Sequence, residues 1–357
     1  MTSYSIPSVV SLREQTENGN HKFEVVSLFA GGGGSSTGYR MAGGKVLAVN
    51  EFISEAVKTY AANWPTTKIL PGDIRKLSGQ EILDLIGKKQ GELDILDGSP
   101  PCSAFSTAGS REKGWGKSKK YSDASQENVE DLFFEYIRIL RDLMPKVFVA
   151  ENVSGLAKGV AKGYLNQILR DLRASGYCVE CKVLDAQWLG VPQKRARTIF
   201  VGIRSDLWKA NMTKKLHPKP SDSRPTLEQA FADLIMTQQD KAESNIEKYS
   251  IFKLLKNLKP GEQHKKRFNL VKSRRDSVAN CITATCGNPG AAKVCHWDNR
   301  AFTVSEIKRI MSVPDDYILT GSYQQRVERL GRMVAPFMMK AVAENILALG
   351  VLNADAR

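Results

Sequence analysis

Phe23-Glu24-Val25-Val26-Ser27-Leu28-Phe29 leads directly into Ala30-Gly31-Gly32-Gly33-Gly34-Ser35-Ser36-Thr37-Gly38. The first stretch is mostly apolar, which predicts a buried strand, and the second predicts a glycine loop at which a helix begins. Glycine allows the backbone to approach a ligand closely, and a helix N-terminus offers free N–H groups. This order is typical of the first half of a nucleotide-binding unit in an open α/β sheet. The glycine spacing is not G-x-G-x-x-G, so a dinucleotide pyrophosphate is not indicated.

Acidic residues stand at the ends of the next two predicted strands. Glu51 follows residues 45–50 and comes 18 positions after Gly33 (51 − 33), close to the spacing at which a carboxylate binds a ribose hydroxyl. An exposed carboxylate or a helix cap is the alternative for Glu51. Asp73-Ile74 follows residues 68–70. Its carboxylate suits an adenine amino group and its isoleucine suits the ring face, with a turn aspartate as an equal alternative.

A single thiol follows the next predicted strand, over residues 93–96, in Asp97-Gly98-Ser99-Pro100-Pro101-Cys102. We expect Cys102 just past the carboxyl end of that strand, the edge at which open α/β sheets bind ligands. Pro100-Pro101 fixes two φ angles, and a rigid turn that presents one thiol suits a nucleophile. A buried core thiol is the alternative, because cysteine is among the residue types most often buried.

A carboxylate and two guanidinium groups are expected at the same edge. Glu151-Asn152-Val153 follows a predicted strand over 146–150, and Gln193, Arg195 and Arg197 lie in the loop before a strand over 198–203. The two arginines alternate, so in an extended segment they share a face. Residues 103–126 form a long glycine-rich loop with five basic residues. This loop predicts a lid over a phosphate-bearing substrate, with a solvated loop as the alternative.

The whole chain is basic. Its 357 residues carry a net charge of +14, with 42% hydrophobic and 25% charged residues. This composition indicates a globular protein with a polyanionic partner, a merely soluble basic protein being the alternative. Six cysteines are too few for a disulfide scaffold, and their spacings predict no metal site. No apolar stretch is long enough for a membrane span and no signal peptide is evident, so we expect a cytoplasmic, nucleoid-associated protein.

Four segments are predicted along the chain. Residues 1–22 are polar and predict a mobile arm, and residues 23–205 alternate strands with helices, as expected of a catalytic, cofactor-binding domain. Residues 206–324 include the stretch 251–275, which has nine Lys or Arg against one acid. This stretch predicts a separate basic module that docks the substrate, with a solvated charged face as the alternative. Residues 325–357 regain helical periodicity, and we expect them to return to the catalytic domain.

These motifs resemble, in order, those of the cytosine-C5 DNA methyltransferases, and the resemblance covers nearly the whole chain. Phe29-Ala30-Gly31-Gly32-Gly33 is similar to the family's S-adenosylmethionine loop, and Glu51 and Asp73-Ile74 stand at its ribose and adenine positions. Pro100-Pro101-Cys102 is similar to its catalytic Pro-Cys. Glu151-Asn152-Val153 and Gln193-x-Arg195-x-Arg197 are similar to its Glu-Asn-Val and Gln-x-Arg-x-Arg.

The resemblance implies a Rossmann-like class I methyltransferase sheet with a second, smaller, basic target-recognition domain. It implies that Cys102 adds to C6 of a cytosine flipped out of a DNA duplex. Glu151 then holds N3 and the exocyclic amine, and Arg197 with Arg195 braces the developing charge. The implied cofactor-binding residues are Phe29, Ala30, Gly31, Gly33, Glu51, Phe52, Asp73, Ile74, Pro100, Leu132 and Val334. The implied substrate-binding residues are Ser106, Gln193, Lys265, Lys266 and Arg267.

Two positions depart from the family pattern. An acid commonly precedes the Leu-Phe of the first motif, and here Ser27 stands there. The late Gly-Asn-x-Val-x-Pro reads Gly331-Arg332-Met333-Val334-Ala335-Pro336, so Arg332 replaces an asparagine that lies beside the cofactor.

The expected cofactor is S-adenosyl-L-methionine and the expected substrate is double-stranded DNA. We expect the protein to be a monomer, with a cognate restriction endonuclease that acts separately. Three other functions stay open. The first is a transfer-RNA cytosine-C5 methyltransferase, although the Cys-Phe-Thr signature of that branch is absent. The second is a sequence-specific DNA-binding protein that has lost activity through Arg332. The third is a Rossmann-type enzyme for a small thiol-reactive substrate, which leaves the basic segment unexplained.

Overall fold

A seven-stranded sheet forms the centre of the protein, with the strand order β3-β2-β1-β4-β7-β9-β8. The computed structural model describes residues 4–17, 19–101, 119–120, 125–127, 129–157, 161–213 and 215–352. The strands are β1 Phe23–Leu28, β2 Gly44–Glu51, β3 Lys68–Pro71, β4 Ile95–Gly98, β7 Val147–Val153, β8 Tyr177–Asp185 and β9 Ala196–Arg204. Neighbours from β3 to β7 pair in parallel, and β9 runs antiparallel to β7 and β8. The predicted α/β, Rossmann-like sheet is therefore confirmed.

The direction in which strands are added changes between β1 and β4. β2 and β3 lie on one side of β1, whereas β4 and the later strands lie on the other. Ligands of open α/β sheets bind outside the carboxyl ends of the strands at such a switch point. The glycine loop follows β1 and the Pro100-Pro101 turn follows β4, so both motifs lie at this edge.

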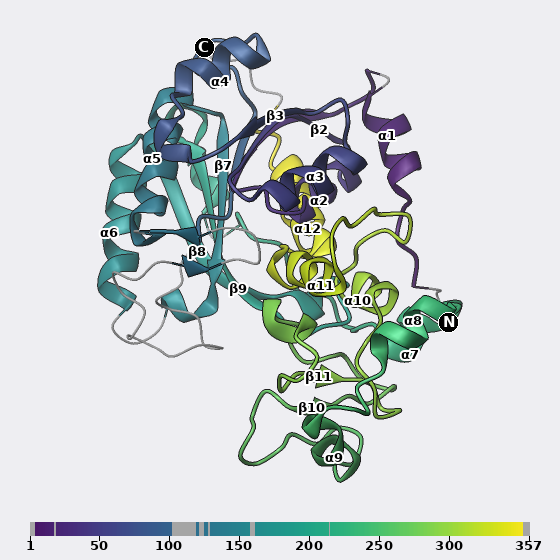
Figure 1. Ribbon diagram of the computed structural model, residues 1–357. Coiled ribbons are helices and arrows are strands. Elements are labelled where there is room, and N and C mark those ends of the chain that lie inside the picture. Colours follow the sequence, from purple (N-terminus) through teal and green to yellow (C-terminus); the bar gives the residue numbers. More distant parts are fainter. Residues whose placement is uncertain are drawn as a thin grey trace.

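Helices cover both faces of the sheet (Figure 1). On one face lie α2 Gly34–Met41, α3 Ser54–Asn63 and α12 Pro336–Ala348; on the other lie α4 Gly79–Ile86, α5 Leu132–Leu143 and α6 Ala161–Ala174. Each face has its own hydrophobic core. In α5 the side chains of Leu132, Tyr136 and Leu140 are all buried, which confirms the helical spacing read from the sequence.

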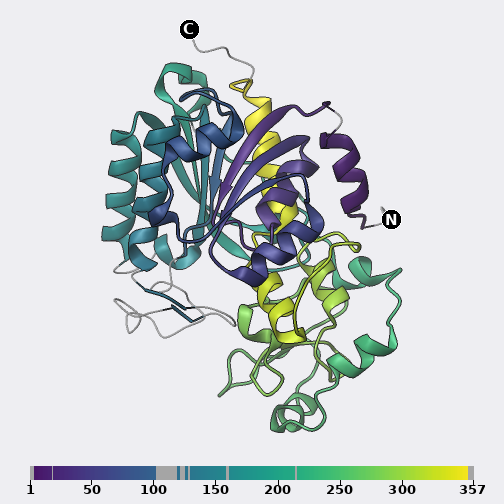
Figure 2. The ribbon, with the colours of Figure 1, turned by 45° about the horizontal axis from the view of Figure 1, so that its top comes forward.

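A smaller lobe extends from one end of the sheet (Figure 2). Its short elements are α7 Leu227–Phe231, α8 Gln238–Ser244, α9 Ser250–Lys256, β10 Val271–Lys272, β11 Val294–Cys295 and α10 Val304–Ile310. Ile251, Leu255 and Leu270 belong to a separate small core inside this lobe. The chain then returns through α11 Tyr323–Arg332 to α12, which packs against α2. The remaining strands β5 Lys119–Lys120 and β6 Ser125–Gln126 form an antiparallel pair.

The N-terminal segment differs from the mobile arm predicted for residues 1–22. Val9–Glu17 forms helix α1, and Val9 and Leu12 are buried against the core of the α2 face. The Arg13 side chain donates hydrogen bonds to the carbonyl oxygens of Ala62 and Asn63. The expectation was wrong because two apolar residues three positions apart are enough to bury one side of a short helix.

Helix α1 gives a direct test of this packing. Leu12→Ala is expected to lower the free energy of unfolding by about 2–4 kcal/mol, because it leaves a cavity in the core. Val10→Ala is the matched control, since Val10 in the same helix is 56% exposed. Chemical denaturation measures both variants. Equal stabilities for the two would show that α1 is not docked.

Candidate active site

The ends of β4 and β7 bring the predicted carboxylate and the Pro-Pro turn together. The two strands pair in parallel, with Gly98 opposite Ala150. The side-chain amide of Asn152 donates a hydrogen bond of 3.2 Å to the carbonyl oxygen of Pro100. Glu151 precedes Asn152 and is largely buried, with 9% exposed. Sequence reasoning missed this role of Asn152, because nothing in its spacing shows which carbonyl it meets.

Arg197 supplies a guanidinium to the same place. Its Nε lies 2.8 Å from Oε1 of Glu151, and the side chains are 15% and 11% exposed. The antiparallel pairing of β7 with β9, in which Val153 faces Arg197, sets this approach. Two of the three groups predicted to converge are therefore in contact. Cys102 and Ser106 lie outside the described residues.

Arg195 does not share the position of Arg197. Its guanidinium is 1% exposed, and it donates to the carbonyl oxygens of Ile282 at 3.1 Å, Gly331 at 2.9 Å and Met333 at 2.7 Å. Burial, and then the charge of Arg197, lowers the pKa of Arg195 to about 10, so it stays protonated at neutral pH. The structure therefore places Arg195 in the interior, where it joins the sheet to the lobe and to the C-terminal segment.

Gln193 is also an interior residue and has no exposed surface. Its side-chain oxygen accepts a hydrogen bond of 3.0 Å from the backbone N–H of Ile282, and its amide nitrogen donates to the carbonyl oxygen of Ile310 at 3.4 Å. The expected direct contact of Gln193 with the substrate needs solvent access that this residue lacks. The alternation of Arg195 and Arg197 predicted a shared face, but Arg195 donates to buried carbonyl oxygens whereas Arg197 pairs with Glu151.

The glycine loop has an unusual backbone. Phe29 and Gly31 both have φ of 55°, and Gly33 has φ of 87°. A positive φ at a phenylalanine is strained and persists where the surrounding structure enforces it. A Cβ added to Gly31 would meet no atom within 4 Å, so the loop faces open space at that residue.

Glu51 fixes this loop from the end of β2. One carboxylate oxygen accepts from the N–H of Gly31 at 2.6 Å and the other from the N–H of Ile53 at 2.7 Å. Burial raises the pKa of Glu51, and these two N–H groups oppose that shift. Each oxygen keeps a second lone pair that can accept a further hydrogen bond. Asp73 lies on the neighbouring strand end and is held by Arg75 at 3.0 Å, while Ile74 is buried.

The sequence as a whole matches the family described as C-5 cytosine-specific DNA methylase over residues 23–348. The chain belongs to this family. By that membership the protein is a DNA cytosine-5-methyltransferase, and DNA and a methyl donor are its implied substrates.

Curated relatives and a solved structure agree with the family. The chain is 30% identical to Type II methyltransferase M1.HphI of Haemophilus parahaemolyticus, covering 91% of this chain and 86% of the relative. It is also 30% identical to Type II methyltransferase M.Eco47II of Escherichia coli, covering 94% and 81%. A structure described as a prophage-encoded DNA modification methyltransferase from E. coli has a TM-score of 0.72 at 19% identity, covering 93% of this chain and all of that one. At that identity the likeness shows the fold alone.

The residues of the methyltransferase fit S-adenosylmethionine at the glycine loop. The two side chains that line the strand ends here, Glu51 and Asp73, are acidic, which suits hydroxyl and amino donors and disfavours a pyrophosphate. The expected neighbours Leu132, at the start of α5, and Val334 are both buried, whereas Phe52 is half-buried. These acidic side chains at the two strand ends are compatible with the hydroxyl and amino groups of a nucleoside.

The C-terminal segment of the methyltransferase packs directly on the glycine loop. A Cβ on Gly34 would lie 2.2 Å from the carbonyl oxygen of Val334, so only glycine fits there. The hydroxyl of Tyr317 donates to the carbonyl oxygen of Gly32 at 2.5 Å. Arg332, which departs from the family pattern, pairs with Glu328 one turn earlier in α11 at 2.8 Å.

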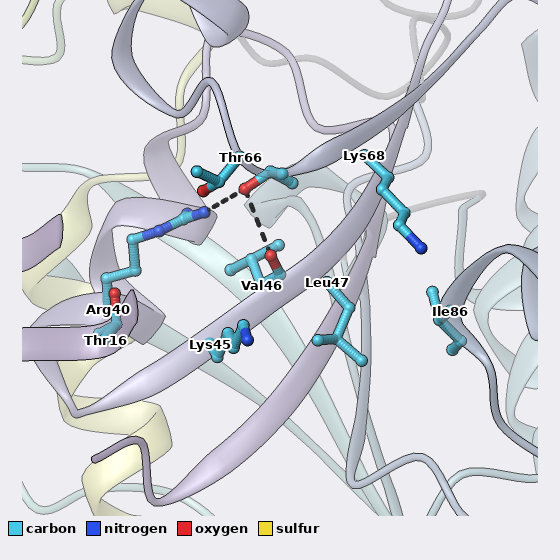
Figure 3. Close-up of a pocket in the computed structure, with 9 residues that line it drawn as sticks. Thr16, Arg40, Lys45, Val46, Leu47, Thr66, Lys68 and Ile86 are labelled. Carbon is cyan, nitrogen blue, oxygen red and sulfur yellow. Dashed lines mark hydrogen bonds between the residues drawn. The ribbon is translucent and has the colours of Figure 1, made fainter. Parts of the chain in front are cut away.

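A hollow with a volume of about 490 Å³ lies at the amino ends of β2 and β3, away from the glycine loop. Figure 3 shows the residues that line it. It is lined by the start of β2 and β3 and by Thr16 and Arg40. Arg40 donates to the hydroxyl of Thr67 at 2.6 Å, and that hydroxyl donates to the carbonyl oxygen of Val46 at 3.3 Å (Figure 3). Because Glu51 is at the other end of β2, this hollow is distinct from the glycine loop.

Neither a membrane span nor a metal cluster is found in the part of the chain that the structure describes. No helix there is long and apolar enough to cross a bilayer. No group of three His, Cys, Asp or Glu side chains there could hold a metal ion.

The contrast between the two arginines predicts different effects of their substitution. Arg195→Met is expected to lower the free energy of unfolding by about 3 kcal/mol or more, because three buried carbonyls lose their donor. Arg197→Met is expected to lower turnover by about 100-fold or more, because it removes the charge that contacts Glu151 at this strand end, with a smaller loss of stability. Denaturant titration and labelled-methyl transfer measure the two effects. The reverse pattern would contradict these roles.

Proposed function

We propose that this methyltransferase transfers the methyl group of S-adenosylmethionine to C5 of cytosine in a specific sequence of double-stranded DNA. The transfer passes through a covalent bond between Cys102 and C6 of a base flipped out of the duplex. The observation that carries the proposal is the contact between Glu151 and Arg197. It lies beside the turn of Pro100-Pro101, to which Cys102 is directly bonded in sequence.

Each group at this edge has a distinct task in the proposed reaction. The thiolate of Cys102 adds to C6, which forms an S–C6 bond and moves electron density through the ring to C5. Glu151 holds N3 and the exocyclic amine while the ring becomes enamine-like. Arg197 fixes one oxygen of Glu151 through Nε and donates to the carbonyl oxygen of Ala196 through Nη1. We propose that the remaining nitrogen, Nη2, donates to the base.

The methyl donor occupies the glycine loop in this proposal. Residues 30–33, Glu51 and Asp73 would hold it, and it supplies an electrophilic methyl group on a sulfonium. After C5 has taken the methyl group, the C5 proton is lost to a base and the S–C6 bond breaks. This restores the C5–C6 double bond and frees Cys102. We propose Arg195 and Gln193 as positioning residues, because both are buried away from any substrate.

The smaller lobe is proposed as the target-recognition domain, over about residues 206–324. Lys265, Lys266 and Arg267 are all exposed on one of its loops. The ring nitrogen Nδ1 of His264 accepts hydrogen bonds from the backbone N–H groups of Lys266 at 3.2 Å and Arg267 at 3.1 Å. The loop is therefore held in one shape that presents three cations, as contacts with DNA phosphates require.

The curated relatives are named Type II methyltransferases. We therefore propose that this protein modifies DNA within a restriction-modification system, with a cognate endonuclease that acts separately. Methyl transfer from labelled S-adenosylmethionine to duplex DNA tests the activity, with transfer RNA as the competing acceptor. Label found only in RNA would overturn the proposed substrate.

Removal of the thiol tests the covalent step. Cys102→Ser is expected to abolish turnover while binding of DNA and of S-adenosylmethionine persists, because the hydroxyl is a much poorer nucleophile. Cys178→Ser on the edge strand β8 is the control and keeps its activity. Labelled-methyl transfer and calorimetry measure the variants. Substantial turnover by Cys102→Ser would exclude the adduct.

Neutralisation of the basic loop tests DNA docking. The triple variant Lys265→Gln, Lys266→Gln and Arg267→Gln is expected to bind duplex DNA more weakly. Its slope of log affinity against log salt is expected to fall by about 0.9 for each DNA phosphate that the loop no longer neutralises. The control replaces Lys162 and Arg170, which are exposed on α6, far from the lobe (Figure 1). A salt slope equal to that of the unaltered protein would show that this loop does not touch DNA.

A further inference from the structure

A buried carboxyl joins the strand that ends in the glycine loop to the strand that ends in the Pro-Pro turn. Ser27 on β1 and Asp97 on β4 face each other in the parallel register. The Ser27 hydroxyl donates to one oxygen of Asp97 at 2.6 Å, and the Tyr39 hydroxyl of α2 donates to the other at 3.2 Å. These hydrogen bonds link the elements on both sides of the switch point.

This carboxyl has no counter-ion among the described residues. Asp97 is 1% exposed, and Ser27 and Tyr39 are fully buried. Among the described residues no cation contributes to the pKa shift of Asp97. A buried carboxyl without a counter-ion destabilises the fold when it is ionised, so its presence beside a reaction site indicates a functional reason.

The carboxyl of Asp97 lies opposite Ser27, the residue that departs from the pattern of the first motif. Ser27 stands immediately before the Leu-Phe of the first motif, where the resemblance led us to expect an acid. Because Ser27 and Asp97 are direct partners across two strands, a carboxyl on either residue lies between the same two strands. The serine here donates to that carboxyl rather than supplying it.

We propose that Asp97 is a positioning residue for methyl transfer, whose buried carboxyl ties β1 and α2 to β4. From this place it holds the glycine loop and the turn before Cys102 in a fixed relation. The inference rests on the proposed methyl transfer.

Ionisation of Asp97 gives the role a measurable signature. Burial, reinforced by the charge of Glu151, raises the pKa of Asp97 to about 7, and the Ser27 and Tyr39 hydroxyls oppose the shift. The titratable groups that face it are Glu151 on β7, Tyr39 on α2 and Tyr136 on α5. Because the hydrogen bonds from Ser27 and Tyr39 favour the ionised carboxylate of Asp97, we expect the ionised form to hold the two strands. Turnover should therefore rise with pH across pH 7.

A reciprocal swap tests the proposal. Asp97→Ser removes the carboxyl and is expected to lower turnover by about 100-fold, as misplacement of reacting groups does. The double variant S27D/D97S returns a carboxyl to the same site from β1, and it is expected to recover most of that activity. Asp97→Asn keeps the shape without the charge, and its turnover is expected to lose the inflection near pH 7. Asp94→Asn, which removes an ion pair with Lys146 before the same strand, is the control and keeps the inflection.

The outcomes separate this inference from the proposed function. If the unaltered protein transfers no methyl group to DNA, the proposed function fails. If the unaltered protein is active and a folded S27D/D97S variant is as impaired as Asp97→Ser, a carboxyl between β1 and β4 does not position the reacting groups, and the inference is wrong. A pH profile of Asp97→Asn that matches that of the unaltered protein also overturns the inference, and this result stands even if the swap variant fails to fold.

Discussion

The guanidinium of Arg195 joins three parts of the chain that are far apart in sequence. Arg195 directly precedes strand β9. Its guanidinium donates to the carbonyl oxygen of Ile282 in the lobe and to those of Gly331 and Met333 in the C-terminal segment. Removing a partner from a buried charged group is costly, so the hydrogen bonds from Nη1 and Nη2 of Arg195 hold these three segments together. The C-terminal segment in turn packs on the glycine loop, where the carbonyl oxygen of Val334 leaves room only for Gly34. The glycine loop and the smaller lobe are thereby linked through Arg195 and the C-terminal segment.

The groups that we propose to react with the base lie at the ends of these strands. The ends of β4 and β7 carry Pro100 and Glu151, and Asn152 ties the two strand ends together. Arg197 reaches Glu151 because β9 runs antiparallel to β7. A carboxyl and a guanidinium held by strands are placed before a substrate arrives, and such preorganisation is what lowers the barrier of a reaction with developing charge.

Sequence patterns predicted the elements better than the way they meet. The strand, the glycine loop and the acidic residue at the next strand end were all foreseen, because apolar runs and glycine have direct physical meanings. The docking of α1 was not, since the apolar spacing of Val9 and Leu12 is too short to stand out. The separation of Arg195 from Arg197 was also missed, because alternation gives the face of a strand but not the carbonyls that meet it. The partnership of Ser27 with Asp97 required the register of two strands, which spacing along one chain does not contain.

The central claim is that the thiol that follows Pro101 bonds to a cytosine held by Glu151 and Arg197. Duplex DNA with 5-fluorocytosine at the target position tests it most directly, because fluorine replaces the C5 proton that must leave. With S-adenosylmethionine present, mass spectrometry of the denatured protein should show a DNA adduct on Cys102. No adduct, or an adduct on another residue, in a preparation that methylates unsubstituted duplex would contradict the account.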